Sequence, residues 1–225
     1  MRMSRLFVWA GGALFVASLA LCAWWYLAVL GAAHDFQPSA VVFNAITFSL
    51  FASHHSLFAR ESVKTALARA VPAHLLRSVY VWIASLLLIL VILAWRPSGG
   101  DLYRVTGWPA LLFAAAQLAG LGLIAGAVKT ISPLELAGIR PHQSKDELQV
   151  VGPYRWVRHP LYLGWVIAVF GAAHMTGDRL AFAAITTIYL MVAVPWEERS
   201  LRKSFGDEYR RYQERVRWRI VPYLY

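Results

Sequence analysis

The sequence has few charged side chains and a single cysteine. Only 15% of its 225 residues are charged, whereas a soluble domain of this length carries about a quarter. Because Cys22 stands alone, the chain can form neither an intrachain disulfide nor a cysteine cluster that binds metal. These two scarcities exclude an ordinary soluble domain and a disulfide-stabilised scaffold.

Long apolar runs take the place of charge. Hydrophobic residues make up 59% of the chain, and a helix needs roughly 20 apolar residues to cross a bilayer. Four runs are long enough, and they predict transmembrane helices at 6–30, 40–58, 74–95 and 107–128. The first run is longer than the apolar core of a signal peptide, so we interpret it as a retained helix. The sequence therefore predicts an all-α integral membrane protein.

The C-terminal part carries two shorter apolar segments and an amphipathic tail. Segments 161–174 and 180–195 are joined by a short polar connection and predict a helical hairpin. In the basic tail that follows, apolar side chains recur every three or four residues, which is typical of a cytoplasmic amphipathic helix. These side chains are Leu201, Phe205, Tyr209, Tyr212 and Val216. We expect one membrane-embedded domain over 1–225, with a part of four transmembrane helices (1–128) and a cofactor-binding part (129–225).

Positive charge is concentrated in the loops on one side of the predicted bundle. The formal net charge is +10, and lysines and arginines gather at the N-terminus, in 60–77, in 129–158 and in the tail after residue 197. Lys and Arg mark the cytoplasmic side of membrane proteins, and anionic lipids attract such segments. We therefore expect a multi-pass protein of the bacterial inner membrane whose site faces the cytoplasm, with membrane lipids as partners and no nucleic acid.

Polar groups suited to chemistry are concentrated in two motifs of the C-terminal part. The first is Gly152-Pro-Tyr-Arg-Trp-Val-Arg-His-Pro-Leu-Tyr-Leu-Gly164, and the second is Pro195-Trp-Glu-Glu198. In a hairpin the chain enters the membrane after the first motif and leaves it before the second, so both motifs lie on the same side. A helix that begins at Pro160 offers free backbone N–H groups and a positive dipole end. The two motifs therefore predict a polar pocket for a zwitterion.

These motifs resemble the cofactor signature of the isoprenylcysteine carboxyl methyltransferase and phospholipid methyltransferase superfamily of integral membrane enzymes. The second half of that signature is similar to Glu197-Glu-Arg-Ser-Leu-Arg-Lys-Ser-Phe-Gly206, followed by Tyr209 and Tyr212. The N-terminal half resembles the methanethiol S-methyltransferase and NnrU-like branch. Its matching positions are His55-Ser-Leu-Phe-Ala-Arg60, Lys64, Arg77-Ser-Val-Tyr-Val81 and Trp95-Arg-Pro97. The resemblance implies S-adenosyl-L-methionine as cofactor and a small hydrophobic or lipid-borne methyl acceptor, a thiol or a carboxylate.

The resemblance also implies roles for individual residues of the two motifs. The implied cofactor-binding residues are Val151, Gly152, Tyr154, His159, Pro160, Tyr162, Gly164, Glu197 and Glu198. The implied catalytic residues are Arg158, His159 and Glu197, with Arg158 near the acceptor. Positioning two reactants for an in-line displacement is worth roughly 7–11 kcal/mol, so positioning is the main task of such a protein. A thiol acceptor reacts as the thiolate, which nearby cations favour.

Other interpretations of the same residues stay open. Arg158 can anchor the chain at lipid phosphates, His159 can end a helix, and the two glutamates can be favoured by a helix dipole. Two further functions are an NADPH-dependent membrane reductase of the sterol-reductase kind and a non-catalytic membrane scaffold. Cofactor binding separates these alternatives.

Two features of the first half call for structural interpretations. His54 and His55 point about 100° apart on a helix, so we expect no metal ion between them. Gly120, Gly122 and Gly126 in the fourth predicted helix are interpreted as helix-packing positions, because glycine lets neighbouring backbones approach closely.

Overall fold

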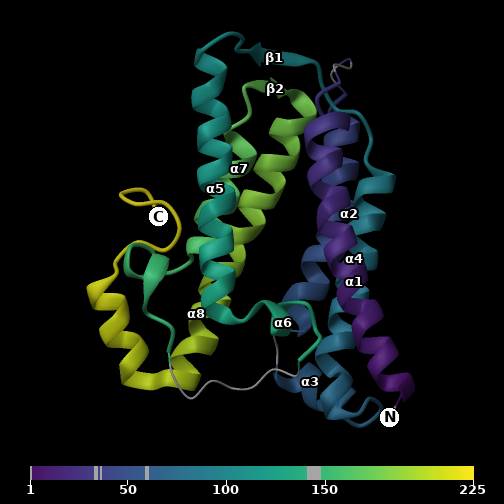
Figure 1. Ribbon diagram of the computed structural model, residues 1–225, viewed down its shortest axis with the longest axis vertical. Coiled ribbons are helices and arrows are strands. Elements are labelled where there is room, and N and C mark those ends of the chain that lie inside the picture. Colours follow the sequence, from purple (N-terminus) through teal and green to yellow (C-terminus); the bar gives the residue numbers. More distant parts are fainter. Residues whose placement is uncertain (1, 33–34, 36, 59–60, 141–147) are drawn as a thin grey trace. The chain divides into compact units, whose positions relative to one another are not determined.

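The computed structural model describes residues 2–32, 35, 37–58, 61–140 and 148–225. Most of these residues are helical, and the strands among them are short (Figure 1). The all-α prediction is therefore confirmed. Arg60, the last matching position of His55-Ser-Leu-Phe-Ala-Arg60, and residues 141–147 of the basic loop 129–158 lie outside the described residues.

The chain divides into two compact units. The first comprises 1–100, 132–143 and 176–178, and the second comprises 101–131, 144–175 and 179–225. Each unit is therefore built from segments that are separated in the sequence. The single domain over 1–225, with its parts 1–128 and 129–225, stays a prediction.

Long helices form the body of the first unit. They are α1 (Arg2–Trp24), which continues into the π-helical turn η1 (Trp25–Val29), α2 (Pro38–Phe58) and α4 (Leu76–Ala94). Shorter helices of this unit are α3 (Glu61–Leu67), η2 (Ala73–Leu75) and α6 (Pro133–Leu136). A proline suits the start of α2, since the N–H that it lacks would have no helical partner there. The helix α4 packs against both α1 and α2 (Figure 1) and buries Val81 and Val91.

A buried carboxylate fixes the connection that follows α4. Asp178 is 1% exposed, and its Oδ1 accepts hydrogen bonds from Trp95 Nε1 at 2.8 Å and from the backbone N and Oγ of Ser98, both at 2.9 Å. The Asn44 amide bonds both the N–H and the carbonyl of Arg96, at 2.9 and 2.8 Å. Burying a charge is costly unless it is hydrogen-bonded, so these contacts make the connection a well-defined part of the first unit.

The second unit contains the pair of helices that carries the first motif. Its elements are β1 (Asp101–Arg104), α5 (Pro109–Ile131), η3 (Gly152–Arg155), α7 (Pro160–Phe170), β2 (His174–Thr176) and most of α8 (Gly177–Arg215). The helices α5 and α7 lie side by side (Figure 1). The strands β1 and β2 pair in a two-stranded sheet, and His174 Nε2 lies 2.5 Å from Asp101 Oδ1. No sequence pattern predicted this sheet.

Among the described residues, five helices are long and apolar enough to cross a membrane. They are Ser4–Val29, Pro38–Phe58, Ala73–Ala94, Pro109–Ile131 and Gly177–Arg215. The four long predicted spans and the assignment as an integral membrane protein are thereby confirmed. The shorter apolar helix α7 has 11 residues, which is below the length of a full span.

The C-terminal hairpin differs from its predicted boundaries. The predicted segment 161–174 ends as a helix at Phe170, because Gly171 terminates α7 and the chain continues into β2. The tail is a separate helix only after Gly206, because α8 (Gly177–Arg215) consists of two helices joined at a kink, and the first of them runs past 195 without a connecting loop. The one backbone break of α8 is at Gly206, with φ 52° and ψ −123°, a conformation open to glycine and strained for other residues.

The apolar face of the tail is covered by the chain itself. Tyr209, Tyr212 and Val216 form a buried cluster, which confirms that these positions share one face. Leu148 and Val150, which precede the first motif, pack against this cluster. The apolar face of the tail therefore closes a small core in the second unit, together with residues that precede the first motif.

Candidate functional site

The two motifs meet in the second unit through a buried ion pair. Arg158 Nε donates to Glu198 Oε1 at 2.6 Å, with 7% of the arginine side chain and 1% of the glutamate side chain exposed. Arg158 lies just before α7, and Glu198 lies in α8, one turn after Pro195. The sequence prediction that residues 158–160 and 195–198 face each other is confirmed.

The segment after α8 completes the surroundings of this pair. Arg158 Nη1 donates to the carbonyl oxygens of Val216 and Arg217, both at 2.7 Å. The backbone N–H of Arg158 donates to the carbonyl of Trp218 at 2.9 Å, and that of His159 donates to the carbonyl of Arg219 at 2.8 Å. One guanidinium thus ties three segments together, which is the kind of buried site that suits the fork of donors in arginine.

Glu198 is a structural acceptor at the centre of this arrangement. Besides the bond from Arg158, its Oε2 accepts a hydrogen bond from Gln213 Nε2 at 3.2 Å and lies 3.4 Å from Arg219 Nε. A buried carboxylate is retained where its charge is paired and hydrogen-bonded. These contacts join both halves of α8 to the loop before α7.

His159, Tyr162 and Glu197 form the more open side of the site. Tyr162 donates to Glu197 Oε2 at 2.9 Å, and its ring is stacked nearly parallel to the His159 imidazole, with centroids 5.3 Å apart. His159 Nδ1 lies 3.6 Å from Glu197 Oε2, and Nε2 lies 3.5 Å from Glu198 Oε1. Both distances exceed those of ordinary hydrogen bonds. Within the described part of the chain, the buried Nε2 makes no hydrogen bond, whereas the Glu197 side chain is 44% exposed.

Tyr154 joins the first motif to the tail through its backbone. Tyr212 donates its hydroxyl hydrogen to the carbonyl of Tyr154 at 2.7 Å. Burial, together with the nearby Glu197 and Tyr212, raises the pKa of the Tyr154 phenol, so this phenol stays neutral and can donate a hydrogen bond. Gly152 opens η3 with a positive φ of 59°, which glycine adopts without strain, and Val151 beside it is exposed.

Gly164 has a packing role in this structure. A methyl group at Gly164 would lie 2.6 Å from the carbonyl oxygen of Gly120, and one at Gly120 would lie 2.6 Å from the carbonyl oxygen of Gly164. The helix-packing prediction for Gly120 is confirmed. That for Gly122 is wrong for the described chain, because nothing lies within 4 Å of its added methyl position. A methyl group added at Gly126 would lie 3.4 Å from Pro153 Cγ, which is an ordinary van der Waals contact.

The structure therefore brings together most of the residues predicted for the site. Successive contacts link Arg158 to Glu198, Glu198 to His159, and His159 to both Tyr162 and Glu197, and Pro160 begins α7 beside them. Their roles toward a cofactor stay predictions. Sequence reasoning missed the carbonyl groups of residues 216–219, because backbone acceptors leave no trace in the residue pattern. Among the described residues, no group of three or more His, Cys, Asp or Glu side chains has the arrangement of a metal site.

The region that contains both motifs matches a known family. Residues 139–208 match the family described as phospholipid methyltransferase. Over a shorter stretch, the chain is 35% identical over 82 residues to a rice (Oryza sativa subsp. indica) protein named "Probable protein-S-isoprenylcysteine O-methyltransferase", covering 35% of this chain and 43% of the rice protein. No solved structure matches the chain.

Bacterial proteins are similar over most of the chain. Methanethiol S-methyltransferase 1 of Bradyrhizobium diazoefficiens is 38% identical over 195 residues, which cover 82% of this chain and 67% of the relative. Methanethiol S-methyltransferase of Mycobacterium tuberculosis is 37% identical over 188 residues, which cover 79% of this chain and 76% of the relative. Both alignments extend well beyond the two motifs.

Proposed function

The chain belongs to the superfamily of integral membrane methyltransferases that includes the methanethiol S-methyltransferases, and from this premise we propose that it transfers a methyl group from S-adenosyl-L-methionine to a small lipophilic thiol. The observation that carries the proposal is the open side of the site. There the exposed carboxylate of Glu197 lies 3.6 Å from His159 Nδ1, beside the start of α7. The thiol is favoured because the bacterial relatives that align over most of the chain are named as thiol methyltransferases.

The chemistry of these residues fits S-adenosyl-L-methionine. That cofactor supplies a methyl group on a sulfonium, ready for in-line displacement, and carries an ammonium, a carboxylate and ribose hydroxyls. The Glu197 carboxylate accepts hydrogen bonds from an ammonium or from hydroxyls. A carboxylate suits the start of α7, which is the positive end of the helix dipole; the N–H groups of Tyr162 and Leu163 there bond to the carbonyl of His159. His159 Nε2 is buried without a hydrogen bond in the described chain and lies 3.5 Å from Glu198 Oε1, so Nδ1, which lies 3.6 Å from Glu197 Oε2, is the nitrogen on the open side.

The chain's own residues then divide into two groups. His159 and Glu197 contact the cofactor, and Tyr162 orients Glu197 through its hydroxyl hydrogen bond. Arg158 is a positioning residue, because its guanidinium is taken up by Glu198 and by the carbonyls of the C-terminal segment. In this proposal Arg158 acts on the reaction by holding the loop before α7, and the acceptor has no direct contact with its charge.

The membrane setting follows from the distribution of charge. The basic loops support a site on the cytoplasmic side of a bacterial inner membrane, where anionic lipids would attract the basic tail. The acceptor reaches the site from the lipid phase, and nucleic acid has no role. Cysteines introduced in place of Arg155 and of Arg104 test the orientation. In intact cells, a membrane-impermeant thiol reagent should modify only one of these two cysteines, and modification at position 155 would contradict a cytoplasmic site.

Equilibrium binding of S-adenosyl-L-methionine to the full chain in lipid nanodiscs tests the proposed cofactor. We expect binding that Glu197→Ala and His159→Ala each weaken at least tenfold, which corresponds to about 1.4 kcal/mol. Glu208→Ala is the matched control, because Glu208 lies on the same helix and is exposed. The control variant should bind like the wild type.

Competition with NADPH separates the proposal from its alternatives. Displacement of the ligand by NADPH would indicate a reductase, and absence of binding by the folded wild type would indicate a scaffold. Binding unaffected by NADPH, followed by methylation of a thiol in the same preparation, supports the methyltransferase. Methylation of carboxylates alone would refute the thiol as acceptor.

A further inference from the structure

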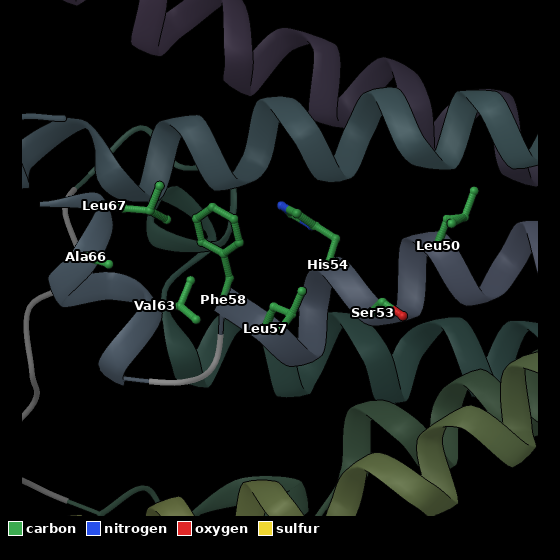
Figure 2. Close-up of a pocket in the computed structure, with 8 residues that line it drawn as sticks. All are labelled: Leu50, Ser53, His54, Leu57, Phe58, Val63, Ala66 and Leu67. Atoms are coloured by element: carbon green, nitrogen blue, oxygen red, sulfur yellow. The ribbon is translucent and has the colours of Figure 1, made fainter. Parts of the chain in front are cut away.

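The first unit contains a cavity at the end of α2 that the proposed site does not use. Its volume is about 650 Å³. It is lined by Leu50, Ser53, His54, Leu57 and Phe58 of α2 and by Val63, Ala66 and Leu67 of α3 (Figure 2). Binding pockets for small molecules are of this size, mostly apolar, and contain a few polar groups that fix the ligand.

His54 is the polar group in this apolar surface that lacks a hydrogen bond. Its side chain is buried, and neither Nδ1 nor Nε2 makes a hydrogen bond within the described chain. Figure 2 shows the imidazole pointing toward Phe58, and the two ring centroids are 4.6 Å apart. The ring is also stacked on Tyr80 of α4, with centroids 5.1 Å apart. Aromatic rings therefore hold the imidazole in place, and both of its buried nitrogens lack a hydrogen bond within the described chain.

The neighbouring polar groups belong to the wall behind His54. The Tyr80 hydroxyl is hydrogen-bonded to His55 Nδ1, and the Arg77 guanidinium lies 4.8 Å from the centre of the Tyr80 ring. Arg77 Nε also donates to the carbonyl oxygen of Glu135 at 2.9 Å. These contacts fix the wall, and His54 and Ser53 are the polar side chains among the residues that line the cavity.

The cavity lies where a molecule dissolved in the membrane can reach it. The helix α2 is one of the candidate spans, and the cavity residues Leu50 and Leu57 are 54% and 47% exposed. In a span, such exposure means contact with lipid chains. An apolar molecule can therefore enter sideways from the bilayer.

We propose that this cavity binds the alkyl chain of a thiol and that His54 hydrogen-bonds its sulfur. The choice of a thiol rests on the proposed function, whereas the cavity and the His54 imidazole without a hydrogen bond are observed independently of that function. The volume favours a chain of several carbons. At about 30 Å³ for a molecule with one heavy atom, as in water, the cavity has room for on the order of 20 such units, whereas methanethiol has two heavy atoms. The ligand class is thus an alkanethiol longer than methanethiol.

Nuclear magnetic resonance of the His54 side chain tests the proposal without any need for turnover. The full chain is prepared in nanodiscs with ¹⁵N-labelled histidine, without S-adenosyl-L-methionine, and the His54 signals are assigned from their absence in His54→Phe. We expect 1-decanethiol to shift these signals with saturation, and decane, which lacks the sulfur, to leave the nitrogen signals in place. Ethanethiol should need at least a tenfold higher concentration than 1-decanethiol.

Two tryptophan variants on α2 control for the place of binding. Leu57→Trp fills the cavity from its wall and should raise the concentration of 1-decanethiol needed for half saturation at least tenfold. Val42→Trp adds the same ring at a position that is 59% exposed and outside the cavity lining, and it should change nothing.

The outcomes separate this proposal from the proposed function. Unshifted His54 signals, or equal shifts with decane, would overturn the thiol site, and the second result would identify the occupant as a lipid chain. If the signals shift and the protein binds no S-adenosyl-L-methionine, the cavity stands and the methyltransferase proposal fails. If the cofactor binds and the His54 signals do not shift, the thiol site is refuted and the methyltransferase proposal is unaffected.

Discussion

The contact between α5 and α7 gives the sharpest prediction, because it depends on two glycines with no room for a side chain. In Gly164→Ala the new methyl group would lie 2.6 Å from the Gly120 carbonyl oxygen and 2.8 Å from Ile124 Cγ1, so the helices must move apart. Overpacking of this kind costs about 1–3 kcal/mol, and the better helix propensity of alanine returns about 0.5–1 kcal/mol. We expect a net loss of about 1–2 kcal/mol, a fall in Tm of roughly 2–8 °C for a chain of this size.

Gly122→Ala is the matched control for this substitution. It adds the same methyl group to α5 at a position with nothing within 4 Å, so only the propensity gain of about 0.5–1 kcal/mol remains. Thermal unfolding of both variants in one detergent, followed by circular dichroism, measures the difference. If Gly164→Ala unfolds like the wild type but loses affinity for S-adenosyl-L-methionine, the packing argument is refuted and Gly164 acts at the cofactor site.

Three further substitutions test other parts of the fold. Gly206→Ala places a side chain at φ 52° and ψ −123°, which costs about 1–3 kcal/mol, and a Tm unchanged from the wild type would contradict this. Asp178→Ala leaves three buried hydrogen-bond donors without their acceptor, and we expect a loss of about 1–3 kcal/mol in the same unfolding assay, against a near-neutral Asp207→Ala at an exposed position. The hydrogen bond from His174 lowers the pKa of Asp101 below its usual 3.8. The stability that this carboxylate contributes is therefore present above pH 3.8 and is lost as pH falls through the lowered pKa, so Tm measured against pH should fall there in the wild type, and Asp101→Asn should lack this component.

The long helices could be predicted because their signal is both strong and local. Each of the four predicted spans is a long, predominantly apolar run, and the bilayer requires such a run to be helical. The ends agree to within a few residues, as for the predicted 40–58 and the observed Pro38–Phe58. The contact between the two motifs was also predictable, since a hairpin returns the chain to the side from which it entered.

The remaining features depend on contacts that no local pattern records. The strands β1 and β2 are short and pair across many residues of sequence, so neither has an alternation long enough to recognise. The tail was predicted as a surface helix because its apolar face is regular. The sequence does not say that Leu148 and Val150 cover that face. Likewise, the arginine before α7 has backbone carbonyls as partners, and every residue carries one of those.

The glutamate pair shows how geometry assigns different roles to adjacent residues with the same chemistry. Consecutive side chains on a helix point about 100° apart, so a doublet at a helix surface cannot place both carboxylates in one environment. Glu198 turns inward, is fully buried and binds Arg158, whereas Glu197 turns outward and meets Tyr162. Removal of one partner from a buried ion pair is strongly destabilising, by about 3–5 kcal/mol, and the loss of an exposed carboxylate is not. Glu198 is therefore needed for the fold, because it holds the loop before α7 against α8. Glu197 can bind a ligand only when Glu198 keeps this part of α8 in place.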